Sequence, residues 1–160
     1  MAILNIVKEG DDTLRKVCRP VTEITPRIIR LLDDMKETLE DANGAGLAAP
    51  QVGILRRICV VDTGEEVLEL INPKIIYENG EQEAVEGCLS IPDVWGYTHR
   101  PAKVIVKAMN RKGEEFTAEG EDVVARCFCH EIDHLDGKLF TDKAVHILTP
   151  DEVDEMMGDR

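Results

Sequence analysis

Residues 127–137 contain the pattern His-Glu-x-x-His, formed by His130, Glu131 and His134. Residues four positions apart in a helix lie on one face, about 6 Å apart along the axis. Two imidazoles at that spacing can bind one metal ion, and the carboxylate of Glu131 could reach a water molecule on that ion. The pattern therefore indicates hydrolytic metal chemistry. The alternative at this point is a pair of histidines packed in a core.

Cys88 is the candidate third ligand. It lies in the turn-rich segment 86–92, where Gly87 permits a backbone conformation that presents the thiol inward. Sets of one or two cysteines with histidine are established metal ligands, and catalytic sites leave the fourth position open. The alternative interpretation is a small, buried core residue.

A helix over residues 121–135 must position both histidines. Its apolar residues recur at a roughly helical spacing, and the segment contains no internal glycine or proline. Gly120 precedes it, and Gly137 follows as a candidate C-cap. Because the apolar positions nearly encircle the segment, we expect a buried, central helix.

The remaining chain predicts a second helix and several strands. Thr25 and Pro26 form the start of a surface helix that runs to about residue 41. The Gly- and Ala-rich segment 44–53 indicates a close approach of the backbone to another group. Asn79-Gly80 predicts a hairpin turn. Strands are expected at 57–62, 67–72, 74–78, 81–87, 103–109 and 114–119, and this arrangement favours the α+β class.

Composition describes a globular chain of 160 residues, 43% hydrophobic and 32% charged. The net charge of −13 disfavours direct binding to nucleic acid or an anionic membrane. No apolar run approaches the ~20 residues of a membrane span, and the N-terminus lacks the pattern of a signal peptide. Five scattered cysteines then predict reduced thiols in a cytoplasmic protein.

Three motifs together resemble the peptide deformylase family: Gly44-Ala-Gly-Leu-Ala-Ala-Pro-Gln51, Glu86-Gly-Cys-Leu-Ser90 and His130-Glu-Ile-Asp-His134. They occur in that family's order and at similar spacing. The resemblance implies one α+β domain over residues 1–160, with antiparallel sheets packed around a central metal-binding helix and a short acidic tail from about residue 146. It also implies a bacterial hydrolase that removes the formyl group from the N-terminal formyl-methionine of newly made proteins.

The resemblance further implies the chemical roles at the site. The metal ligands would be Cys88, His130 and His134, with Fe²⁺ the usual ion and Zn²⁺, Ni²⁺ or Co²⁺ able to replace it. Glu131 would take a proton from the attacking water and pass it to the departing amine. The developing oxyanion would receive hydrogen bonds from the Gln51 side chain and the Leu89 backbone N–H.

Substrate binding is implied at four further positions. The backbone of Gly46 would pair with an extended peptide, in the manner of an added strand. The methionine side chain would enter a pocket near Gly44, Glu86 and Cys127. The expected partners are nascent N-formylmethionyl peptides and, transiently, the ribosome, although the acidic tail does not match the basic C-terminal helix of some relatives.

Two competing hypotheses and two ambiguous features stay open at this point. A zinc peptidase of the His-Glu-x-x-His kind would not need Cys88 or Gln51. A non-catalytic relative would be expected to have lost one of the residues that this chain retains. Trp95 could line the peptide site or cover a core. Arg100 and Asp133 could form either a pair that supports a ligand or a surface ion pair.

Overall fold

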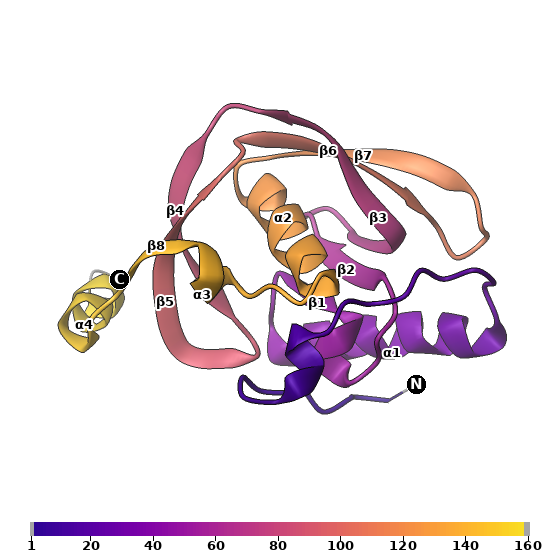
Figure 1. Ribbon diagram of the computed structural model, residues 1–160, viewed down its shortest axis with the longest axis horizontal. Helices are drawn as coiled ribbons and strands as arrows, with labels where there is room; N and C mark the ends of the chain where they lie inside the picture. The colour runs from indigo at the N-terminus through magenta and orange to yellow at the C-terminus, as the bar shows by residue number, and fades with distance from the viewer. Residues whose placement is uncertain (1, 159–160) are drawn as a thin grey trace.

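The computed structural model describes residues 2–158 of the chain and contains two antiparallel sheets that curve around one helix (Figure 1). The strands are β1 (Gly46–Ala48), β2 (Ile58–Asp62), β3 (Val67–Asn79), β4 (Gln82–Cys88), β5 (Ile91–Arg100), β6 (Lys103–Met109), β7 (Glu115–Glu121) and β8 (Ala144–Ile147). One sheet has the order β1-β2-β3-β6-β7 and the other the order β4-β5-β8. The helices are α1 (Pro26–Ala42), α2 (Val123–Leu135), α3 (Phe140–Lys143) and α4 (Pro150–Gly158), with short 3₁₀ turns η1 (Asp12–Arg15) and η2 (Ala49–Val52).

The central helix is α2, and it is buried as its apolar pattern predicted. Phe128 and Leu135 have no exposed surface, and they pack with residues of β2, β3 and β6 in one hydrophobic cluster. The helix begins two residues later than predicted. β7 extends through Glu121, and Asp122 has a positive φ of 52° that turns the chain before the first helical residue.

The second helix, α1, forms where the sequence predicted it. The hydroxyl of Thr25 accepts a hydrogen bond from the backbone N–H of Ile28 at 3.3 Å, and Asn43 ends the helix in the left-handed conformation. β2 lies between the two helices, and the side chains of a strand alternate between its two faces. Ile58 and Val60 therefore pack in the hydrophobic cluster that contains α1 residues, and Cys59 and Val61 pack in the cluster that contains α2 residues.

The prediction of two strands separated by Pro73 was wrong, because β3 runs continuously through that position. Its pairing with β6 shifts register between Ile71 and Lys74, and such a bulge accommodates a residue that has no N–H to donate. Asn72 adopts a positive φ of 53° at the bulge, and its side-chain amide bonds to both backbone groups of Val21 at 2.8 Å.

The predicted hairpin at Asn79-Gly80 was also wrong. These residues turn the chain, but β4 pairs with β5 in the other sheet rather than with β3. β5 (residues 91–100) was not predicted as a strand. The hairpin of this region turns at Leu89 and Ser90, directly after Cys88, whereas the predicted β6–β7 hairpin is present as expected.

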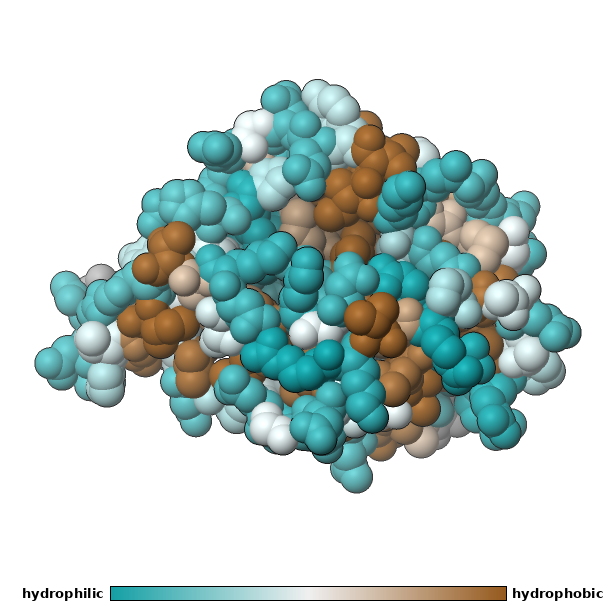
Figure 2. All heavy atoms as spheres, in the orientation of Figure 1, coloured by the Kyte–Doolittle hydropathy of each residue, from teal (hydrophilic) through white to brown (hydrophobic). Residues whose placement is uncertain are grey.

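The predicted acidic tail contains a helix, α4, which projects from the body and has no fully buried residue (Figure 1). Thr149 and Glu152 cap it reciprocally through two hydrogen bonds. Hydrophobic atoms are visible at this end of the molecule (Figure 2), where Val145 and Ile147 of β8 are exposed. Within residues 2–158, no helix is both long and apolar enough to cross a membrane.

We expect Gly137→Ala to destabilise the protein more than Gly53→Ala. Both glycines have positive φ, 73° and 84°, so both variants should lose about 1 kcal/mol from backbone strain. Only at Gly137 would the new Cβ collide with a fixed group, the backbone oxygen of Arg15 at 2.5 Å, whereas nothing lies within 4 Å at Gly53. That collision should add about 2 kcal/mol, measured by urea unfolding. Equal losses in the two variants would contradict the close packing of the α2 end against η1.

Candidate active site

The structure brings together the three predicted metal ligands, which come from two elements. Cys88 ends β4, and His130 and His134 lie one turn apart on α2. One donor atom from each residue lies within 4.8 Å of the other two, and Cys88 Sγ is 3.4 Å from His134 Nε2. A thiol and two imidazoles so close together fit the ligand set of a divalent transition-metal ion.

His130 is oriented by a buried carboxylate. Its Nδ1 lies 2.9 Å from Glu86, which also accepts hydrogen bonds from Thr98 and from two nitrogens of Arg100 at 2.9 and 3.0 Å. Burial alone would raise the pKa of Glu86, but the bonds from His130 and Arg100 outweigh it and lower that pKa far below its usual range. Because Glu86 is therefore an anion, Nδ1 must donate, which leaves Nε2 as the ring nitrogen that could bind a metal ion.

Glu86 lines the cavity, as the resemblance implied, and its hydrogen bonds join the β4–β5 hairpin to α2. Its carboxylate is fully engaged by three side chains. Arg100 is only 4% exposed and also bonds to Asp133 at 2.7 Å, so the interpretation as a surface ion pair was wrong. Arg100 supports His130 through Glu86, a contact that no local pattern in the sequence signals.

The two imidazoles differ electrostatically in the metal-free protein. Burial lowers the pKa of His134 well below its ordinary value, with the charges on His130 and Arg100 adding to the effect. Burial also acts to lower the pKa of His130, but Glu131, Cys88 and Glu86 outweigh it and raise that pKa. A metal ligand must be a neutral imidazole, so a cation would displace a proton from His130.

Glu131 has the properties of a proton acceptor at neutral pH. It is 3% exposed, and its Oε1 atom has no hydrogen-bond partner among residues 2–158. Burial, together with the negative charges of Glu86 and Asp133, raises its pKa to about 7. Gly46 leaves room for this carboxylate, because a Cβ there would lie 2.6 Å from Glu131 Oε2. A carboxyl with this pKa can both accept and release a proton during a reaction cycle.

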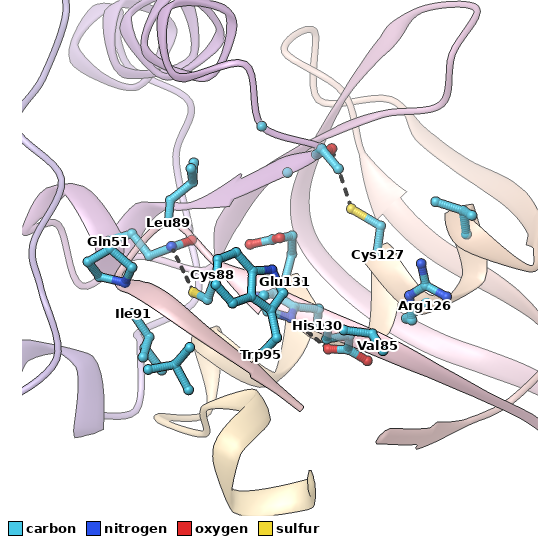
Figure 3. Close-up of a pocket in the computed structure, with 18 of the residues that line it drawn as sticks. Gln51, Val85, Cys88, Leu89, Ile91, Trp95, Arg126, Cys127, His130 and Glu131 are labelled. Atoms are coloured by element: carbon cyan, nitrogen blue, oxygen red, sulfur yellow. Dashed lines mark hydrogen bonds and ion pairs between the residues drawn. The ribbon is translucent and has the colours of Figure 1, made fainter. Parts of the chain in front are cut away.

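Gln51 directs its amide nitrogen toward the cluster. The side chain is 1% exposed, and its Oε1 accepts a hydrogen bond from the Ala48 backbone N–H at 2.9 Å. The Nε2 atom consequently lies 3.1 Å from Ser90 Oγ. It also lies 3.6 Å from Cys88 Sγ (Figure 3). Leu89 follows Cys88 in the hairpin turn and lines the same cavity. The contact with Ser90 was not anticipated, since nothing in the sequence links these two loops.

A cavity of about 450 Å³ opens beside the cluster (Figure 3). The predicted positions Gly44, Gly46, Glu86 and Cys127 all line it. Trp95 also lines it, with the indole packed so closely on Gly87 that a Cβ there would lie 2.9 Å from Nε1. The lining residues that sequence reasoning did not identify include Val85, Ile91, Val94, Val123 and Arg126.

The other cysteines and histidines lie outside the cluster. Burial raises the pKa of Cys127 well above its ordinary value, so the thiol stays protonated, and its Sγ lies 3.4 Å from the Ala45 carbonyl oxygen. Cys129 is buried in the core around α2. His99 and His146 are exposed and pair with glutamates on the surface.

Comparison with known proteins shows which protein family this sequence resembles. A family model described as polypeptide deformylase matches residues 3–149. A peptide deformylase of Acetivibrio thermocellus is 54% identical over 154 residues, covering 96% of this chain and 91% of the relative. One of Desulfitobacterium hafniense is 58% identical over 144 residues, covering 90% and 96%.

Solved structures agree with the match in sequence. The crystal structure of peptide deformylase from Thermotoga maritima superposes with a TM-score of 0.86 at 39% identity, covering 89% of this chain and 97% of that one. A peptide deformylase from Synechococcus elongatus, solved in complex with actinonin, gives a TM-score of 0.85 at 36% identity, covering 98% and 85%. The expected α+β fold, with antiparallel sheets around a central helix, is thereby confirmed.

We expect Glu131→Gln to stabilise the metal-free protein at alkaline pH. The native pKa of about 7 exceeds the ordinary value of 4.5, so the wild type loses stability as pH rises from about 4.5 through 7. The neutral amide avoids that loss, which amounts to about 3 kcal/mol at pH 8. Urea unfolding at pH 5 and pH 8 with a chelator present measures it. The matched variant Glu81→Gln, at an exposed position, should show no pH-dependent difference; a pH-independent effect of Glu131→Gln would contradict the assignment.

Proposed function

Because this chain belongs to the polypeptide deformylase family, we propose that the candidate site is its catalytic centre, in which one divalent ion is held by Cys88, His130 and His134. The family activity is hydrolysis of the formyl group on the N-terminal formyl-methionine of newly made proteins, with release of formate. The observation that carries the proposal is the mutual approach of these three donors beside the buried carboxylate of Glu131.

The residues around the cluster can divide the reaction between them. A divalent ion held there would lower the pKa of a bound water and polarise the formyl oxygen. Glu131 takes the proton of the attacking water and returns it to the nitrogen of the departing amine, so that water and the formamide yield formate and the free amine. Gln51 Nε2 and the Leu89 backbone N–H donate to the oxyanion that develops on the formyl group.

The cavity explains how the substrate would be held. Gly46 belongs to β1, which is an edge strand of the larger sheet and can pair with an extended peptide through its backbone. The methionine side chain would lie against Gly44 and Cys127. Glu86 lines the pocket without offering a free charge, since Arg100 neutralises its carboxylate and His130 donates a hydrogen bond to it.

The finer assignments rest on the chemistry of the chain. One thiol and two imidazoles are compatible with Fe²⁺, our preferred ion, and with Zn²⁺, Ni²⁺ or Co²⁺. We assign the activity to a single domain over residues 1–160, acting in the cytoplasm, where nascent peptides emerge and where the five free cysteines stay reduced. Transient contact with the ribosome would not use α4, whose charged residues are all acidic.

A deformylase is favoured over an ordinary zinc peptidase by two observations. Cys88 joins the two histidines, and the amide of Gln51 points to the same cluster, whereas a His-Glu-x-x-His peptidase needs neither group. A non-catalytic relative is disfavoured because Glu131 and Gln51 are both present and buried at the cluster.

The direct test is formate release from formyl-Met-Ala-Ser by protein purified without oxygen and loaded with Fe²⁺ or Ni²⁺. We expect rapid turnover by the wild type and a loss of at least about 100-fold in Glu131→Gln with metal still bound, because the proton acceptor is gone. A wild type that binds metal without releasing formate would exclude deformylation.

Metal content distinguishes the proposed ligand from another thiol of the same cavity. Cys88→Ala should lose roughly 100-fold or more in metal affinity, since it removes one of three ligands. Cys127→Ala, which removes a protonated thiol that lines the cavity, should bind metal like the wild type. Elemental analysis after dialysis against a competing chelator measures both, and equal metal contents would refute the ligand assignment.

A further inference from the structure

The first residues of the chain form an extended segment, residues 2–9, which we call the N-terminal strap. Its first half is attached to α1 beside it (Figure 1). The backbone N–H of Ala2 donates to Asp34 at 2.7 Å, and that of Leu4 donates to Thr38 Oγ1 at 2.8 Å. Both acceptors are buried side chains of the helix, so this half of the strap has a fixed anchor.

The second half of the strap bonds to both loops that carry the proposed oxyanion donors. The backbone N–H of Val7 donates to the carbonyl oxygen of Gln51 at 2.7 Å. Two residues later, the N–H of Glu9 donates to the carbonyl oxygen of Ser90 at 2.8 Å. Gln51 is adjacent to the larger sheet, whereas Ser90 lies in the turn of the smaller one, so the strap links the two sheets at the site.

Side chains of the strap reinforce the same link. The ammonium of Lys8 lies 3.3 Å from the carbonyl oxygen of Leu89. The side chain of Val7 packs against a small buried cluster that includes Ile91, and Cys88 packs against the same cluster. Ile91 and Cys88 lie on either side of the Leu89-Ser90 turn. The strap thus contacts the turn through backbone, charge and apolar surface.

These bonds close a ring. Gln51 Nε2 donates to Ser90 Oγ at 3.1 Å. The same two residues accept, at their carbonyl oxygens, the hydrogen bonds from the N–H groups of Val7 and Glu9. Gln51 and Ser90 are 1% and 0% exposed, so water does not compete for their side chains. Buried hydrogen bonds that share members restrain one another, and movement of one loop must disturb the other.

We propose that the backbone N–H groups of Val7 and Glu9 are positioning groups that set the separation of the Gln51 amide and the Leu89 N–H. The proposal rests on the proposed function, in which these two groups stabilise one oxyanion. Two donors in loops of different sheets can act on one atom only if their distance is held to a fraction of an ångström. The strap bonds the carbonyl groups of both donor loops and so supplies that constraint.

The turn after the strap permits a clean removal of one bond. Asp11 N–H donates to Lys8 O at 3.2 Å, and Gly10 at the third position has φ 101°, as in a type II turn. Glu9 occupies the second position, where proline is favoured. Glu9→Pro therefore keeps the turn and deletes the N–H that bonds to Ser90, together with the exposed Glu9 side chain. The matched control is Leu4→Pro, which deletes a strap N–H of similar hydrogen-bond length that bonds to α1.

The experiment compares these variants as metal-loaded, full-length protein. For Glu9→Pro we expect kcat on formyl-Met-Ala-Ser to fall about 10-fold, with KM and the affinity for the product Met-Ala-Ser within about 2-fold of wild type. Amide hydrogen exchange should accelerate in residues 49–52 and 88–91. Leu4→Pro should lower the thermal midpoint as much but leave kcat and the exchange of both loops within about 2-fold of wild type.

Either of two results would overturn the proposal: wild-type kcat and exchange in Glu9→Pro, or an equal fall of kcat in Leu4→Pro. Lys8→Met replaces an exposed side chain and should fold normally, with kcat lowered about 3-fold. Unchanged kcat in Lys8→Met would contradict the claim that the strap positions Leu89, and this test holds even if Glu9→Pro does not fold. A wild type that releases no formate would reject the proposed function instead, and loop exchange alone would then decide whether the strap holds the loops.

Discussion

The geometry of the site depends on the buried ion pair between Glu86 and Arg100. Both residues belong to the β4–β5 hairpin, and their charges reach α2 through His130 and Asp133. Breaking a buried pair by removing one partner is costly, because the remaining charge is left without compensation. The hairpin consequently cannot shift along the helix without separating the charges, and Cys88, which ends β4, is held beside the two histidines.

Apolar packing in the hydrophobic clusters offsets the loss of folding stability caused by these buried polar groups. α2 packs against one face of β2 and α1 against the other, so the helix that carries both histidines is fixed by apolar contacts along most of its length. The face of α2 that carries Val123, Arg126, Cys127, His130 and Glu131 borders the cavity instead. Glu131 is buried there with one unpaired oxygen, a condition that reduces stability and that raises its pKa to about 7. Destabilised polar groups of this kind are typical of functional sites.

The site is assembled where two sheets meet. Gly46 comes from the edge of the five-stranded sheet, Cys88 from the three-stranded sheet and the histidines from the helix between them. Gln51 and Ser90 connect the two sheets through a direct hydrogen bond, and the N-terminal strap bonds to both loops from the outside. In such a site each side chain is held by its own helix or strand. The distances between side chains from different elements, however, must be fixed by additional contacts between those elements.

The sequence by itself determined the features that depend on neighbours along the chain. Helical spacing placed His130 and His134 on one face, Thr25 and Pro26 marked the start of α1, and the three motifs indicated the family. Tertiary structure alone decided that β3 continues through Pro73, that β4 pairs with β5, and that Glu86, Arg100 and Ser90 support the site. The reason is physical: periodicity and capping are fixed within a few residues, whereas strand partners and buried charge pairs are chosen by contacts between segments far apart in the chain.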